Sequence, residues 1–105
     1  MDYSESIKKT EKYISEHLSE DLTAESIAAN AGYSVFHFCR VFKEKTGKSL
    51  MRYVREKRLE VAEKEMENGE TTAEVAVKYG FETSSGFSRA YFRKFGERPK
   101  KRMNA

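Results

Sequence analysis

The chain is poor in the residues that disulfide-linked and metal-binding proteins need. Its 105 residues include one cysteine, Cys39, and two histidines, His17 and His37. A single cysteine excludes a disulfide within the chain and suits a reducing compartment. His37 and Cys39 are two residues apart, so on a helix they point in nearly opposite directions and do not fit one metal ion. We therefore expect no metal and no cofactor.

Long apolar runs are also missing. No stretch approaches the roughly 18 apolar residues of a membrane span, and the N-terminal ten residues lack the apolar centre of a signal peptide. The chain has one proline and no tryptophan, and no segment alternates between apolar and polar residues as a half-buried strand does. There is no P-loop, no GxGxxG and no interpretable spacing of acid, histidine and nucleophile. These absences predict an all-α, cytoplasmic protein that contacts no membrane and is not an enzyme.

What the sequence does contain is one pattern that occurs twice. Residues 23–47 and 71–96 carry matching alanine, glycine, aromatic and basic residues in the same order. The matched pairs, 48 or 49 residues apart, are Ala28–Ala76, Gly32–Gly80, Tyr33–Phe81, Phe38–Phe87, Arg40–Arg89, Lys45–Lys94 and Gly47–Gly96. Each copy predicts a short helix, a tight turn and a second helix, which is the layout of a helix-turn-helix that reads DNA.

Apolar spacing and capping residues predict seven helices in one domain over residues 1–105. Six are expected at about 5–18, 24–31, 35–47, 50–68, 72–80 and 84–95, and a short seventh after Pro99. The expected N-caps are Ser4, Thr23, Ser49 and Thr71, and Gly32 is expected to adopt a positive φ. Within this domain, residues 1–48 contain the first helix-turn-helix, residues 49–69 are expected to form a linker helix, and residues 70–105 contain the second helix-turn-helix.

Charge is distributed unevenly between the two ends of the chain. Residues 1–35 hold seven acidic and three basic side chains, whereas residues 36–105 hold 10 acidic and 17 basic ones. The resulting net charges are −4 and +7. The positive charge falls where the second helix of each repeat is expected, which favours DNA as the partner.

A helical wheel divides residues 35–47 into two faces. The inward face carries Phe38, Val41, Phe42 and Lys45, and the outward face carries Phe36, Cys39, Arg40 and Lys43. Arg40 is expected to donate two hydrogen bonds to a guanine, and Lys43 to neutralise a phosphate. Phe36 and Cys39 are expected to contact a thymine methyl group or a sugar. Cys39 is interpreted as a small apolar contact rather than a redox switch.

His37, at the flank of the outward face, is a candidate donor of a hydrogen bond to a phosphate. The alternative for Arg40 is a surface salt bridge with Glu44.

The second copy has different outward residues. They are Ser85, Ser88, Arg89, Phe92 and Arg93, with Phe87, Ala90, Tyr91 and Lys94 inward. Ser84, Ser85, Ser88, Arg89 and Arg93 are candidate DNA contacts. Gly86 costs a helix about 1 kcal/mol relative to alanine, and we weigh two explanations equally: close approach to the DNA backbone, or a frayed helix start.

These residues resemble a known family. The strings GYSVFHFCRVFKEKTGKSL and VAVKYGFETSSGFSRAYFRKFGERP are similar to the paired helix-turn-helix domain of AraC/XylS-type bacterial transcription regulators. The resemblance covers roughly residues 7–99 and rests on the ordered pattern A-x-x-x-G-[YF], F-x-R-[VA]-[FY] and G, present twice. It implies two three-helix lobes, at 1–48 and 70–105, joined by a long linker helix at 49–69. It also implies that Phe36, Cys39, Arg40, Ser85, Gly86, Ser88 and Arg89 face successive major grooves.

Two departures from the family pattern stand out. Phe92 occupies a position where the family usually has a basic residue, and Arg93 is the candidate replacement. The family's Pro-x-x-Tyr-Arg is replaced by PKKRM at residues 99–103, which leaves Lys100, Lys101 and Arg102 as further candidate phosphate contacts.

Taken with the resemblance, the sequence predicts a sequence-specific regulator of transcription that binds double-stranded DNA. We expect a monomer on an asymmetric promoter site, with DNA bending. The resemblance implies contact with RNA polymerase, location at the nucleoid and an effector-binding domain, if there is one, outside this chain. The alternative is a helical protein-interaction module that does not bind DNA.

Overall fold

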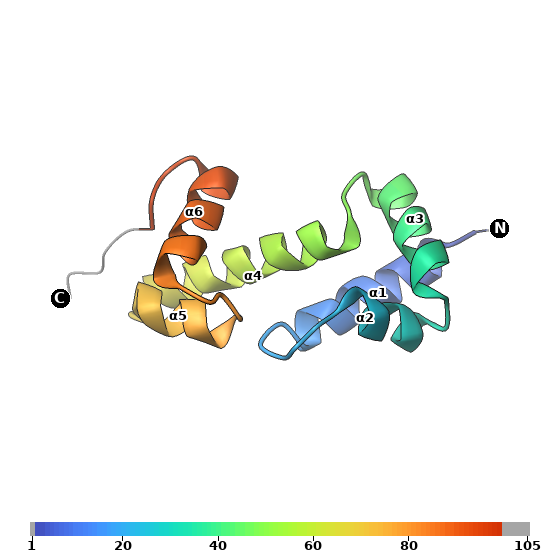
Figure 1. The fold of residues 1–105 in the computed structure, drawn as a ribbon, viewed down its shortest axis with the longest axis horizontal. Helices are drawn as coiled ribbons and strands as arrows, with labels where there is room; N and C mark the ends of the chain where they lie inside the picture. Colours follow the sequence, from blue (N-terminus) through green and yellow to red (C-terminus); the bar gives the residue numbers. More distant parts are fainter. Residues whose placement is uncertain (1, 100–105) are drawn as a thin grey trace. The chain divides into compact units, whose positions relative to one another are not determined.

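A computed structural model describes residues 2–99, and within that range every regular element is a helix. The six helices are α1 (Ser4–Glu16), α2 (Ala24–Ala31), α3 (Val35–Thr46), α4 (Leu50–Glu67), α5 (Thr72–Lys78) and α6 (Ser84–Phe95) (Figure 1). This confirms the predicted all-α class. The seventh helix, expected after Pro99, lies outside the described residues, as do Lys100, Lys101 and Arg102.

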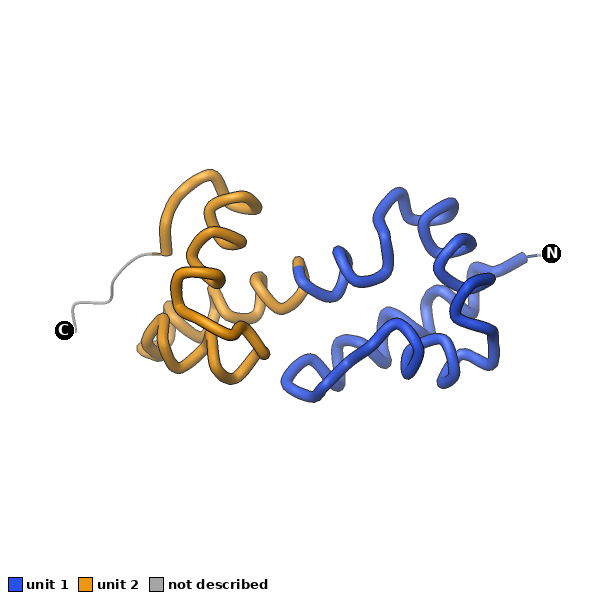
Figure 2. Tube along the Cα trace, viewed as in Figure 1, with its two compact units in different colours: residues 1–55 blue, residues 56–105 orange. Residues whose placement is uncertain are grey.

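The chain divides into two compact units, residues 1–55 (unit 1) and residues 56–105 (unit 2) (Figure 2). The division falls inside α4, which therefore belongs partly to each unit. Leu50 and Val54 are buried near the start of α4, and Leu59, Ala62 and Met66 are buried further along it. Burial at both ends shows that α4 is a packing element of each unit rather than a fully solvated connector.

Helix starts follow from side chains that accept hydrogen bonds from free backbone N–H groups. The Thr23 hydroxyl accepts from the Ser26 N–H at 3.0 Å, and the Thr71 hydroxyl accepts from the Glu74 N–H at 3.1 Å. In both cases the third residue returns a bond to the backbone of the cap, which completes a capping box. These caps fix the first helix of each helix-turn-helix.

The start of α1 differs from the prediction. Tyr3 occupies the N-cap position and Ser4 is the first helical residue, so the assignment of Ser4 as the cap is wrong. The Asp2 carboxylate instead accepts the Ser4 N–H at 2.9 Å and the Ser4 hydroxyl at 2.7 Å. These two hydrogen bonds, with a smaller contribution from the charge of Lys45, lower the pKa of Asp2.

The turns inside the two helix-turn-helix segments are built alike. Gly32 has φ 86° and Gly80 has φ 82°, a region that side chains rarely adopt. The residue after each glycine donates back to an alanine carbonyl, Tyr33 to Ala28 at 3.0 Å and Phe81 to Ala76 at 2.9 Å. The positive φ predicted for Gly32 is confirmed, although α5 ends at Lys78 rather than at Gly80.

The apolar residues predicted to face inward on α3 and α6 belong to the core of their units. Phe38, Val41 and Phe42 are buried in unit 1, and Phe87, Ala90 and Tyr91 are buried in unit 2. Lys45 is exposed, so its predicted inward position is wrong, and Lys94 is only partly buried. The buried aromatic rings of Phe38 and Phe87 each contact the aromatic residue of the preceding turn, Tyr33 and Phe81 respectively.

Polar contacts add to the apolar core of unit 2. Glu65 of α4 accepts a hydrogen bond from the Tyr79 hydroxyl at 2.7 Å and pairs with Lys78 at 3.2 Å. Glu60 pairs with Lys94 of α6 at 3.2 Å. Although burial opposes the shift, hydrogen bonds from Lys94 and Lys57 lower the pKa of Glu60. These bonds fix α5 and α6 against the second half of α4.

Candidate nucleic-acid interface

The second helix of the first helix-turn-helix, α3, carries five of the eleven predicted contact residues. Its start is capped by the Ser34 hydroxyl, which accepts the His37 N–H at 3.2 Å, and its end is marked by Gly47 with φ 82°. Burial of Phe38 and Phe42 leaves the opposite face outward. Phe36 is 86% exposed, so its ring lies on the solvent side of α3.

The outward side chains of α3 line one groove of about 780 Å³. Phe36, Cys39, Arg40 and Lys43, four of the predicted contacts, all belong to its lining. We call this cavity the α3 groove. Val35 and Glu44 of α3 also line it. Ser49, Leu50 and Met51 complete the lining, and a helical wheel of residues 35–47 could not include them because they follow α3 in the chain. No ion pair within 4.0 Å engages Arg40 in the part of the chain that the structure describes, so its guanidinium is available to a base.

His37 lies apart from the α3 groove, in an aromatic cluster at the start of α3. Its Nε2 is 3.1 Å from the Tyr3 hydroxyl, and the Tyr3 and Tyr33 rings lie 5.8 Å and 5.7 Å from the imidazole. The Tyr33 hydroxyl also shares a hydrogen bond with Ser6 of α1 at 3.1 Å. These contacts hold the N-terminal end of α3 against α1. A phosphate contact by His37 stays a prediction.

The second helix of the helix-turn-helix in unit 2, α6, has a groove of its own, which we call the α6 groove. It measures about 1060 Å³ and contains five predicted contacts in its lining, Ser84, Ser85, Ser88, Arg89 and Arg93. Thr72, Phe92, Gly96, Arg98 and Pro99 complete the lining. Phe92 is 54% exposed, and three arginines share this groove without any acidic residue. Such a lining attracts an anion.

Gly86 lies inside α6 but does not line its groove. Its N–H donates to the Thr83 hydroxyl at 2.9 Å, which caps the helix. The start of α6 is therefore capped by Thr83, and close approach of Gly86 to the DNA backbone stays a prediction. A Cβ at this position would lie 3.2 Å from the Thr83 Oγ1, so a side chain fits only if Thr83 gives way slightly.

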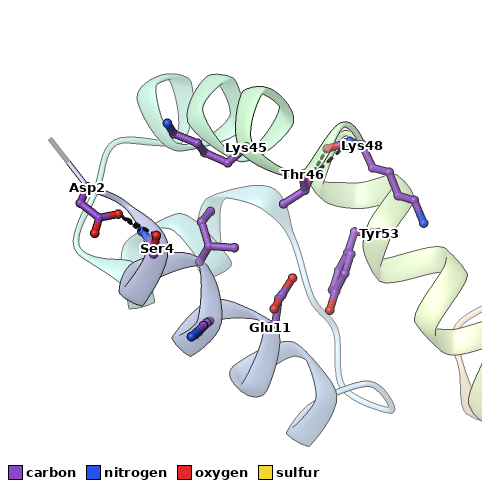
Figure 3. A pocket seen from close by; sticks show the side chains of 9 residues that line it. Asp2, Ser4, Glu11, Lys45, Thr46, Lys48 and Tyr53 are labelled. Atoms are coloured by element: carbon purple, nitrogen blue, oxygen red, sulfur yellow. Dashed lines mark hydrogen bonds between the residues drawn. The ribbon is translucent and has the colours of Figure 1, made fainter.

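A third cavity, of about 540 Å³, lies in unit 1 between α1, the end of α3 and the start of α4 (Figure 3). Its lining mixes Lys8, Lys45 and Lys48 with the acidic residues Asp2 and Glu11. Opposite charges face the same space, so the cavity has little net attraction for a phosphate. It contains none of the predicted DNA-contact residues.

Each unit thus presents one capped, exposed helix after a glycine turn, and these features define the class of a paired helix-turn-helix domain. Comparisons with known proteins agree. A family described as a helix-turn-helix domain matches residues 27–104. The multiple antibiotic resistance protein MarA of Escherichia coli (strain K12) is 34% identical over 90 residues, which covers 85% of this chain and 71% of MarA. The right origin-binding protein of the same organism is 30% identical over 100 residues, covering 94% of this chain and 35% of that protein.

Solved structures show the same fold. An AraC family transcriptional regulator from Rhodopseudomonas palustris, described as probable, superimposes with a TM-score of 0.81 at 26% identity, covering 90% of this chain and 91% of that one. The DNA-binding domain of AdpA, solved in complex with a target DNA, gives a TM-score of 0.80 at 26% identity, with 89% and 85% coverage. The chain belongs to the AraC/XylS-type family of DNA-binding transcription regulators.

Family membership confirms that the chain is a DNA-binding domain and not an enzyme. Across residues 2–99, none of the helices has the length and apolar character needed to cross a membrane. Within the same range, no three His, Cys, Asp or Glu side chains gather into a metal-binding cluster.

Proposed function

We propose that this chain binds an asymmetric promoter site by placing α3 and α6 in successive major grooves of one duplex. The observation that carries the proposal is the lining of the two grooves. Nine of the eleven predicted contact residues line either the α3 groove or the α6 groove. Each groove includes one arginine at the matched repeat position, Arg40 or Arg89. An arginine presented by an exposed helix face suits bidentate recognition of guanine.

Different neighbours around the two arginines support an asymmetric site. Arg40 lies among Phe36, Cys39 and Lys43, whereas Arg89 lies among serines. An apolar side chain favours a thymine methyl group, while a hydroxyl both donates and accepts and tolerates several bases. We therefore infer that the two helices read different half-sites.

The length of α4 supports bending of the DNA. Its 18 residues span about 27 Å at 1.5 Å per residue. Successive faces of the major groove are about 34 Å apart. Bending the duplex toward the protein shortens that distance, and its cost depends on the sequence that is bent. Bending thus adds specificity at base pairs that the protein does not touch.

The family and the repeat support a proposal for the partners. Two reading helices in one chain make a second copy unnecessary, so we propose that a monomer binds. Regulation of transcription is proposed to act through contact with RNA polymerase. An effector-binding domain, if the regulator has one, lies outside these 105 residues.

Selection of bound sequences from a random duplex pool tests the proposal, followed by measurement of affinity for the selected duplex and for single-base variants. We expect two unlike half-sites about one helical turn apart, each containing a guanine. Arg40→Ala should remove the preference at one guanine and Arg89→Ala at the other. Each change should weaken binding by about 1–3 kcal/mol.

The matched control is Arg55→Ala, because Arg55 is an exposed arginine that lines neither groove. This variant should leave both guanine preferences unchanged. A selected site made of two identical half-sites, or loss of the same base preference in both groove variants, would contradict the proposal.

A further inference from the structure

The two grooves are built from equivalent positions of the repeat. Eight positions in the lining of the α3 groove, between 35 and 50, have counterparts 49 residues later in the lining of the α6 groove, between 84 and 99. The repeat therefore extends beyond the helix-turn-helix to the segment that follows each reading helix. Equivalent positions of the two linings can therefore be compared one by one.

That comparison shows a difference in charge. Glu44 of the α3 groove is replaced by Arg93 in the α6 groove, and Ser49 is replaced by Arg98. The α3 groove carries two basic residues and one acidic residue, whereas the α6 groove carries three arginines and no acid. The lining of the α6 groove is the more positive by two charges, which strengthens its attraction for a polyanion.

Arg98 is the unexpected member of this set, because it lies outside the reading helix. It follows the Gly96 cap of α6 by two residues, and its side chain is exposed. Among the described residues, no ion pair within 4.0 Å engages Arg93 or Arg98. In the same groove Phe92 replaces the basic residue found in unit 1, Lys43. Position 92 thus lacks the positive charge of Lys43, whereas Arg93 and Arg98 add positive charge to the same lining.

We propose that Arg98, together with Arg93, binds the DNA phosphate backbone at the edge of the α6 groove. This makes unit 2 the more salt-sensitive half of the interface. The proposal rests on the proposed docking of α6 in a major groove. A guanidinium matches the geometry of a phosphate through paired N–H donors. Because such a contact carries no base information, it strengthens binding to every sequence by a similar factor.

The test is Arg98→Ser, which places at position 98 the residue that unit 1 carries at the equivalent position 49. Binding is measured by fluorescence anisotropy with the selected duplex and with a random-sequence duplex at several salt concentrations. Loss of one phosphate contact should reduce the slope of log K against log salt by about 0.9. At 0.1 M salt the affinity should fall by about fivefold to tenfold on both duplexes, with unchanged base preference.

Two further variants separate a phosphate contact from a change in overall charge. Arg98→Lys keeps the cation and should keep the slope. Lys64→Ser removes a cation from an exposed position of α4 outside the groove, and it should leave the slope unchanged. Equal slopes for Arg98→Ser and the wild type would overturn this inference, and so would an equal reduction in Lys64→Ser. Failure of the wild type to bind any duplex would instead overturn the proposed function itself.

Discussion

Arg40 and Arg89 illustrate what a single residue contributes to a reading helix. Both are exposed on helices whose opposite face is buried, and both lie in the lining of a groove. Their position could be predicted from the sequence because Phe38 and Phe87, two residues earlier, had to face inward. A period of 3.6 residues then places the arginine on the other side. The contact between His37 and Tyr3 could not be predicted in this way, because Tyr3 is 34 residues away in the chain.

Gly86 offers a test at the residue scale. A Gly86→Ala substitution raises helix propensity by up to about 1 kcal/mol, but the new methyl group meets Thr83 Oγ1 at 3.2 Å. The two effects oppose each other, so we expect the thermal midpoint to change by only a few degrees. If Gly86 allows close approach to DNA, affinity for the selected duplex should fall about tenfold, or about 1.4 kcal/mol.

Circular dichroism provides the control for folding, and anisotropy measures binding. Unchanged affinity in the folded variant would show that Gly86 serves the helix start alone.

At the scale of elements, most helix starts could be predicted from the sequence, but the elements against which each helix packs could not. Thr23 and Thr71 were identified as caps because a hydroxyl followed three residues later by a polar side chain is a local signal. Ser4 was misassigned because Asp2, two residues earlier, captures its N–H. The attachment of α5 and α6 to α4 depends on Glu60, Glu63 and Glu65, whose partners on α5, at its C-cap and on α6 lie 13 to 34 residues further along the chain.

The bond between Tyr79 and Glu65 gives a prediction at this scale. Tyr79 is 4% exposed and donates to Glu65 at 2.7 Å, so Tyr79→Phe should lower the free energy of unfolding by about 1–2 kcal/mol. The matched control is Tyr91→Phe. The Tyr91 hydroxyl lies 3.4 Å from Glu63, and loss of this longer bond should cost less than about half as much. Urea denaturation followed by circular dichroism measures both values, and equal losses would contradict the argument.

The same tyrosine predicts a pH dependence. Burial and the hydrogen bond to Glu65 raise the pKa of Tyr79 above its ordinary value. The folded state therefore favours the protonated phenol. Its contribution is fully present below the ordinary tyrosine pKa of about 10 and is lost as the pH rises above it. The difference in stability between the wild type and Tyr79→Phe should shrink above pH 10.

For the whole molecule, the number of chains on each duplex tests directly whether a monomer binds, because one chain contains both copies of the repeat. Light scattering of the complex should give one chain of 12.2 kDa for each selected duplex. Two chains on each duplex would contradict the proposed monomer.

Circular permutation of the binding site should show a bend, since α4 is shorter than the spacing of successive grooves. Unchanged mobility across the permuted fragments would contradict bending.

The sequence by itself determined the helices, their order and the faces that they bury, because capping, glycine turns and helical periodicity are local properties of the chain. It also determined the family, since the repeated pattern spans most of the 105 residues. Only the tertiary structure decided which residues share a groove. Ser49 and Arg98 follow the reading helices in the chain and join their grooves because the chain turns back at Gly47 and Gly96. A surface that receives DNA is assembled from separate elements, and helical periodicity describes only one element at a time.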